Sequence, residues 1–169
     1  GAGARGMAEN EAHVANIRDT VGSDIEIMAD AYMGWDFHYA KKMCRRLEKY
    51  EMAWLEEPFV PDDLRSYARL RQETSIPISG GEHEYTRYGF LDIIEKEAMD
   101  IIQPDLRRCG GLSEGRRICA LALANGITVI PHAYGPTHIH FALAETAIPM
   151  IEYFPLPCWD DLPDAEVEP

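Results

Sequence analysis

The chain has 169 residues, of which 46% are hydrophobic, so it can bury a substantial core. Its formal net charge of −13 disfavours a nucleic-acid-binding function, because neutralising phosphates requires clusters of basic residues and none is present. No apolar run approaches the roughly 20 residues of a membrane-spanning helix, and no basic segment followed by an apolar stretch marks a signal peptide.

Six short apolar runs alternate along the chain with amphipathic stretches. The runs are typical of buried parallel strands and cover residues 25–29, 52–55, 76–78, 99–102, 127–130 and 148–151. Helices are predicted between them, around residues 39–47, 62–71, 90–94, 113–125 and, more weakly, 136–147. Ser113 is placed to cap the fourth of these helices and Asn125-Gly126 to end it. Uninterrupted alternation of this kind predicts an α/β fold with a parallel sheet.

We expect residues 1–154 to form one domain, a partial β/α barrel with about six of eight strands. The segment 155–169 is rich in proline and acidic residues and is predicted to be a loop or linker. A closed eight-stranded barrel needs roughly 200 or more residues, so the chain is expected to begin just before the third strand and to stop soon after the eighth. An open sheet would expose two edges, and we expect this piece alone to be poorly soluble and inactive.

An acidic residue or a histidine follows each apolar run. The separations of these residues match the length of one strand, one helix and two loops. In β/α barrels the carboxyl ends of the strands carry the catalytic groups, so we expect all six side chains to lie on one rim. They are Asp30, Glu56, Glu82, Asp105, His132 and Glu152.

Three of these side chains, Asp30, Glu56 and Glu82, end successive strands and are predicted to converge. Converging carboxylates repel one another unless a cation neutralises them. Oxygen ligands without cysteine or histidine suit Mg²⁺ better than zinc. The alternative is that each acid is a solvated loop residue or a charge at the N-terminus of a helix.

The next two side chains, Asp105 and His132, are predicted to form a dyad in which the aspartate orients the imidazole and leaves its other nitrogen free for proton transfer. Glu152 is expected either to hydrogen-bond a substrate carboxylate or to form a salt bridge on the rim. His83 points toward Glu82 only if the turn bends, so a substrate-binding and a structural role stay open for it. His138 and His140 are expected to serve packing or surface roles.

The four cysteines, Cys44, Cys109, Cys119 and Cys158, have neither a C-x-x-C pair nor a zinc spacing. Reduced thiols in a cytoplasmic protein are therefore expected.

The constellation resembles the enolase superfamily and, within it, the mandelate racemase subgroup, over about residues 6–155. The segment GGEHEYTRYGF, with a histidine directly after Glu82, is most similar to acid-sugar dehydratases of the rhamnonate type. In WLEEP the matching metal ligand is Glu56, which makes Glu57 an outer-sphere residue. The segments that carry the resemblance are IMADAYMGWD, WLEEP, GGEHEYTRYGF, IIQPDLRRCGGLSE, IPHAYG and MIEYFP.

The resemblance implies a (β/α)₇β barrel, with an N-terminal α+β capping domain that this chain lacks. It also implies Mg²⁺-dependent dehydration of a sugar acid to a 2-keto-3-deoxy acid. In that reaction His132 removes the proton α to the carboxylate, and the metal stabilises the resulting ene-diolate. Glu152 would hydrogen-bond the other carboxylate oxygen, and His132 or His83 would protonate the leaving hydroxyl.

Two alternatives remain. One is a racemase or epimerase of a 2-hydroxy acid on the same scaffold, which would need a second base on the opposite face of the substrate. The other is an inactive barrel fragment. The expected partner is a small sugar acid, with neither nucleic acid nor membrane, and family members tend to be homo-oligomers.

Overall fold

The computed structural model describes residues 3–153 and contains five short parallel strands in one sheet. The strands lie side by side in their order along the chain, so each connection crosses over to the neighbouring strand. The predicted α/β class with a parallel sheet is confirmed. The strands are β1 (Met28–Asp30), β2 (Trp54–Glu56), β3 (Ile78–Gly80), β4 (Ile101–Ile102) and β5 (Thr128–Val129).

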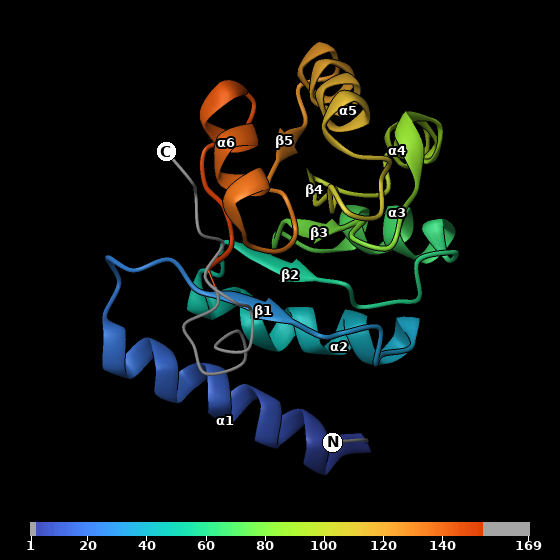
Figure 1. Ribbon diagram of the computed structural model, residues 1–169. Helices are drawn as coiled ribbons and strands as arrows, with labels where there is room; N and C mark the ends of the chain where they lie inside the picture. Colours follow the sequence, from blue (N-terminus) through green and yellow to red (C-terminus); the bar gives the residue numbers. More distant parts are fainter. Residues whose placement is uncertain (1–2, 154–169) are drawn as a thin grey trace.

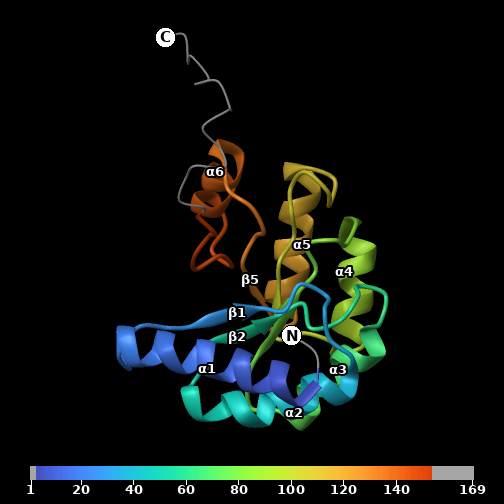
Figure 2. The ribbon, with the colours of Figure 1, turned by 90° about the horizontal axis from the view of Figure 1, so that it is seen from below.

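The helices form an outer arc around the curved sheet (Figure 1). Figure 2 shows α1 lying beside α2, and the two helices are in contact. A short 3-10 helix, η1, continues from the end of α2. The bounds are α1 Gly3–Val21, α2 Phe37–Leu47, η1 Glu48–Tyr50, α3 Leu64–Glu73, α4 Thr86–Glu95, α5 Leu112–Ala124 and α6 Pro136–Ala144.

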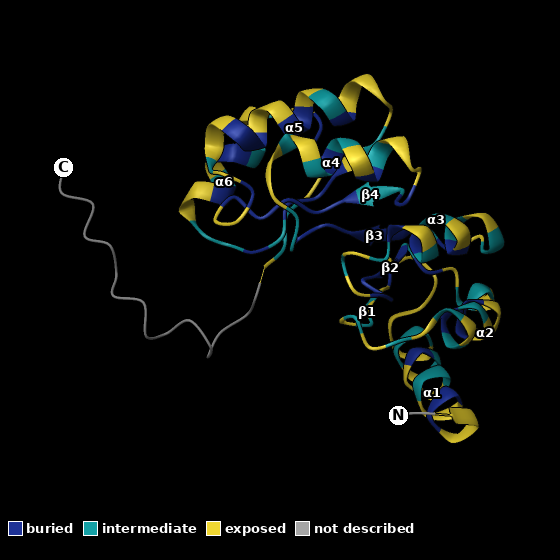
Figure 3. Ribbon diagram, turned by 90° about the vertical axis from the view of Figure 1, so that its right-hand side faces the viewer, coloured by how far each residue is buried: buried dark blue, intermediate teal, exposed yellow. Residues whose placement is uncertain are grey.

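The main core lies between the sheet and this arc of helices. Leu55 and Ile78 are register partners on neighbouring strands and therefore share a face. Both are fully buried, and they belong to one apolar cluster with helix residues. Figure 3 shows the same division, with buried residues on the inner sides of the helices and exposed residues on their outer sides. The helix members of the cluster include Met43, Leu47, Tyr67, Leu70, Phe90, Ile93, Ile118 and Ala122.

Side-chain caps account for where two of the helices begin. Asp36 precedes α2 and accepts a hydrogen bond from the amide of Tyr39 at 2.8 Å. Asp63 precedes α3 and accepts one from the amide of Ser66 at 3.1 Å. Each carboxylate satisfies an amide that has no partner within its helix. The helix predicted around residues 62–71 is therefore confirmed, with Asp63 as its cap.

The predicted strand over residues 148–151 is wrong. That segment has no strand structure. The residue just before it, Ala147, accepts a long backbone hydrogen bond of 3.4 Å from the amide of Val129 in β5. Pro149 interrupts the segment, and proline has no N–H to donate to a neighbouring strand. The described sheet therefore has five strands.

The helix boundaries also differ from the prediction in three places. Ser113 does not cap α5, because Gly110 and Gly111 have positive φ angles (113° and 83°) and turn the chain so that the helix begins at Leu112. The last helix ends at Ala144 rather than near residue 147. Helix α1 was not predicted, since only Met7 and Val14 among its larger apolar residues are buried.

None of the described helices is both long enough and apolar enough to cross a membrane. Cys44, Cys109 and Cys119 are buried free thiols, and burial raises the pKa of the first two to about 11 and of the third to about 12. Cys158 and the segment 155–169 lie outside the described residues.

Candidate active site

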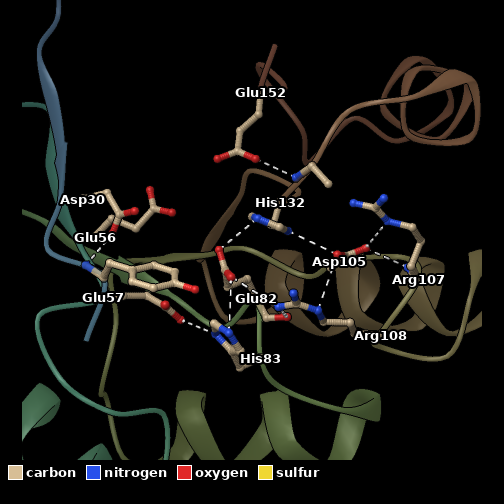
Figure 4. Close-up of polar contacts among 12 residues, drawn as sticks. Asp30, Glu56, Glu57, Glu82, His83, Asp105, Arg107, Arg108, His132 and Glu152 are labelled. Atoms are coloured by element: carbon tan, nitrogen blue, oxygen red, sulfur yellow. Dashed lines mark hydrogen bonds and ion pairs between the residues drawn. The ribbon is translucent and has the colours of Figure 1, made fainter. Parts of the chain in front are cut away.

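Five of the six predicted residues lie at the carboxyl ends of the strands or directly after them, and Glu152 lies after α6. Asp30 and Glu56 are the last residues of β1 and β2. Glu82, Asp105 and His132 follow β3, β4 and β5 within three residues. Because the strands are ordered as in the chain, these ends line one edge of the sheet. Figure 4 shows the five residues together with Glu152 around a common space.

Asp30 and Glu56 form the acidic side of this space. Glu56 is only 8% exposed, and burial raises its pKa to about 7, even though the Trp54 indole N–H donates to its Oε2 at 3.1 Å. Burial also raises the pKa of Asp30, and the charge of Glu82 acts in the same direction. Asp30 belongs to β1, the first strand of the sheet, and is exposed, so solvent weakens the effect of burial and charge on its pKa. Both carboxylates are therefore in an environment that a cation would stabilise.

Glu82 occupies the centre of the site. Its Oε2 lies 3.0 Å from Nε2 of His132, and its Oε1 lies 3.2 Å from Nη1 of Arg108 and 3.5 Å from Nε2 of His83. The carboxylate is buried, and its neighbours come from the loops after β3, β4 and β5. Glu82 thus connects the acidic side of the site to the histidine side.

His83 turns toward Glu82, so the turn after β3 bends. Gly80 and Gly81 have φ angles of 159° and 106°, of which that of Gly81 is strongly left-handed. Nδ1 of His83 lies 3.1 Å from Oε1 of Glu57. The other carboxylate oxygen of Glu57 is buried and has no hydrogen-bond partner within residues 3–153. Single donor atoms of Glu57, Glu82 and His83 all lie within 4.8 Å of one another and could hold a metal ion. Sequence reasoning did not place Glu57 in such a group.

The predicted Asp105–His132 pair is present in the structure. Nδ1 of His132 lies 3.2 Å from Oδ2 of Asp105, which is 1% exposed. Burial acts to raise the pKa of Asp105, yet the pKa of this carboxyl is lowered. The amide of Arg107 and the ring of His132 donate hydrogen bonds to the carboxylate, and the positive charge of Arg107 stabilises its ionised form. Asp105 therefore remains an anion that can orient the imidazole.

Glu152 closes the site from the segment after α6. Its Oε2 accepts a 2.6 Å hydrogen bond from the amide of Ala133, which has a φ of 73°. Burial raises the pKa of Glu152. This contact fixes the glutamate against the residue that follows His132, in the same space as Asp30 and Glu82.

Two arginines of the site were missed by sequence reasoning. The amide of Arg107 donates to Oδ1 of Asp105 at 2.8 Å, and Nη1 of Arg108 contacts both the backbone oxygen and Oε1 of Glu82. Their only sequence signal is that they follow Asp105 directly in QPDLRR. His138 is buried and His140 is exposed, which agrees with the packing and surface roles expected for them.

Comparison with known proteins gives a family match over nearly the whole chain. Residues 1–168 match the family described as "Enolase C-terminal domain-like". L-rhamnonate dehydratase from Saccharopolyspora erythraea is 37% identical over 153 residues, which are 89% of this chain and 39% of that protein. The chain thus spans about two fifths of the length of this curated relative.

Two solved structures extend the comparison. Rhamnonate dehydratase from Gibberella zeae, complexed with Mg, is 36% identical with a TM-score of 0.85, and the match covers 89% of this chain and 37% of that chain. L-talarate dehydratase from Polaromonas sp. JS666, complexed with Mg and L-glucarate, is 32% identical with a TM-score of 0.83, and the match covers 88% and 42%. With its parallel sheet and its rim of acidic and histidine residues, the chain belongs to the enolase superfamily and corresponds to part of its C-terminal domain.

Proposed function

We propose that the protein containing this chain is a Mg²⁺-dependent hydro-lyase that converts a sugar acid (an aldonate) into a 2-keto-3-deoxy acid. The observation that carries the proposal is the position of His132, between the buried anion Asp105 and the central carboxylate Glu82. The dehydratases to which the chain is similar support the same reaction class.

Asp30, Glu56 and Glu82 are the residues proposed to hold the metal ion. They fit a divalent cation, because they are oxygen donors and because burial raises the pKa values of Asp30 and Glu56, so a positive charge would stabilise their ionised forms. The ion would supply positive charge beside the substrate carboxylate as that group becomes more anionic. The Glu57–Glu82–His83 group shares Glu82 with this set.

His132 is proposed as the base. It would accept the proton from the carbon α to the substrate carboxylate, while Asp105 holds its Nδ1 side and stabilises the imidazolium. The imidazolium would then return a proton to the departing 3-hydroxyl, so that water leaves and an enol forms, which tautomerises to the keto acid. Glu152 would hydrogen-bond one oxygen of the substrate carboxylate, and His83 would bind another part of the substrate.

The test is a panel of sugar acids, L-rhamnonate among them, offered to the intact protein with Mg²⁺ or with a chelator. We expect a 2-keto-3-deoxy acid to appear only with Mg²⁺. Solvent deuterium entering at the α carbon without loss of water would instead support racemisation or epimerisation. No exchange and no keto acid with any member of the panel would contradict the proposal.

The isolated 169-residue chain is expected to be inactive and poorly soluble, because within the described sheet β1 and β5 each have a neighbouring strand on one side alone and form its two edges. A soluble monomer with Mg²⁺-dependent activity would contradict this.

We further propose a cytoplasmic location, in line with the buried free thiols, and a homo-oligomeric parent protein.

A further inference from the structure

Asp105 lies between two histidines. On one side Nδ1 of His132 is 3.2 Å from Oδ2. On the other side Nε2 of His138 is 3.5 Å from Oδ1. His138 belongs to α6, two residues after the proline that begins the helix, whereas His132 lies in the loop after β5. The two rings therefore approach the two oxygens of one carboxylate from different elements.

The Nε2 atom of His138 is buried and needs a partner. The residue is 3% exposed, and among the described residues this nitrogen has no hydrogen bond of ordinary length. A buried polar atom without a partner is costly, so the nearest acceptor matters. That acceptor is Oδ1 of Asp105, and since an ionised carboxylate only accepts, the proton of His138 must be on Nε2. Burial lowers the pKa of His138, which favours the neutral ring.

The other contacts of Asp105 explain what such a donor would do. Oδ1 also accepts from the amide of Arg107 at 2.8 Å, and the Arg107 side chain is 52% exposed. Oδ1 is thus held from the solvent side by Arg107, and His138 faces it from the buried side. Arg107 contacts Oδ1 through its Nε as well, at 3.4 Å. Arg107 and His138 together set the plane of the carboxylate, so that Oδ2 faces the ring of His132.

We propose that His138 is a positioning residue for the base: its neutral imidazole donates from Nε2 to Oδ1 of Asp105 and holds the carboxylate in the orientation that His132 requires. The inference deepens the proposed function and rests on it. A packing role alone makes a different prediction, because an apolar ring of similar size would then serve equally well.

The chain offers a matched control for this proposal. His140 lies two residues further along α6 and is exposed. In the intact protein with L-rhamnonate as substrate, His138→Phe removes the donor and keeps a ring, His138→Gln keeps an N–H donor, and His140→Phe tests the helix surface. We expect His138→Phe to lower kcat about 10-fold or more with little change in KM, as is usual for outer partners of functional histidines. His138→Gln should recover most of kcat, and His140→Phe should match the wild type.

Equal kcat values in His138→Phe and His140→Phe would overturn the inference while the proposed function stands. A second measurement is independent of turnover and of the stability of the Phe variant. Long-range ¹H–¹⁵N NMR of the wild-type protein should show His138 neutral, with its proton on Nε2, and Asp105→Asn should shift those signals. A proton on Nδ1, or signals that Asp105→Asn leaves unchanged, would overturn the inference even if L-rhamnonate is not a substrate.

Discussion

Each ring nitrogen of His132 faces a carboxylate: Nε2 lies 3.0 Å from Oε2 of Glu82, and Nδ1 lies 3.2 Å from Oδ2 of Asp105. The proposed base therefore contacts one of the proposed metal ligands directly. Metal binding at Glu82 would compete with that contact and leave Nε2 for the substrate. Base and metal site are thus expected to respond to each other's mutations.

Replacing the base gives the most direct test of the mechanism. His132→Asn keeps a polar side chain but removes the proton acceptor, so keto-acid formation by the intact protein should fall by about 10² to 10⁴-fold. Thermal stability should change little. His140→Asn, on the exposed side of α6, is the matched control. Unchanged turnover in His132→Asn would exclude this residue as the base.

Stability should depend on pH and Mg²⁺ together. Without metal, Glu56 keeps its proton in the folded protein up to about pH 7, whereas the unfolded chain loses it near the ordinary value of 4.5. The stability contributed by this group is thus present below 4.5 and is lost as pH rises through 7. Since metal binding requires the charged carboxylate, Mg²⁺ should raise Tm more at about pH 8 than at about pH 5.5. Thermal unfolding with Mg²⁺ or a chelator measures this, and a Tm increment independent of pH would count against the Glu56 assignment.

Neutralising the same glutamate should separate metal binding from folding. Glu56→Gln keeps the shape and can still face Trp54, but it removes a buried negative charge. We expect a higher Tm than wild type above about pH 7 without metal, and a strong loss of the Mg²⁺-dependent increment. The control is Glu26→Gln, at an exposed position ahead of β1. It should leave unchanged both the Tm without metal and the increase in Tm that Mg²⁺ causes. Calorimetric titration with Mg²⁺ provides a second readout.

Glu152 is expected to act as a hydrogen-bond donor to the substrate carboxylate. Burial raises its pKa, which is the direction that a protonated donor requires, and the amide of Ala133 holds it in place. Glu152→Gln preserves an N–H donor and should retain much more kcat than Glu152→Ala. The alanine variant should lose about 10² to 10³-fold, the usual effect of removing one such donor. Equal losses in both variants would point instead to a structural salt bridge or packing role.

Packing between α5 and its neighbours can be tested without substrate. A Cβ at Gly115 would lie 2.6 Å from Cδ2 of Leu106 and 3.0 Å from Cζ of Phe141, both of which are buried. Gly115→Ala should therefore destabilise the protein by about 1–3 kcal/mol, as overpacking does elsewhere. Gly89→Ala in α4 is the control, because the atoms nearest to its new methyl belong to the side chain of Glu84, which can move. Denaturant unfolding of the two variants compares them directly.

Much of the fold could be predicted because the signals are local. Alternating apolar runs and amphipathic stretches predicted the parallel sheet, and Asp63 marked the start of α3. The failures were also local conflicts: Pro149 prevents the strand predicted over 148–151, and the positive φ angles of Gly110 and Gly111 start α5 before Ser113. Helix α1 buries too few residues to show a clear period.

Local patterns in the sequence were enough to predict which side chains share a rim, Glu152 included, although the strand expected before Glu152 is absent. The periodicity of strands and helices, together with the order of βα units, is enough for that inference. Three contacts emerge in the folded protein alone: His83 bends toward Glu57 and Glu82, Arg108 contacts Glu82, and His138 reaches the far side of Asp105. Apart from the contact between the adjacent residues His83 and Glu82, these contacts join residues that are 26 or more positions apart. They depend on loop conformation and helix packing, which no local pattern encodes.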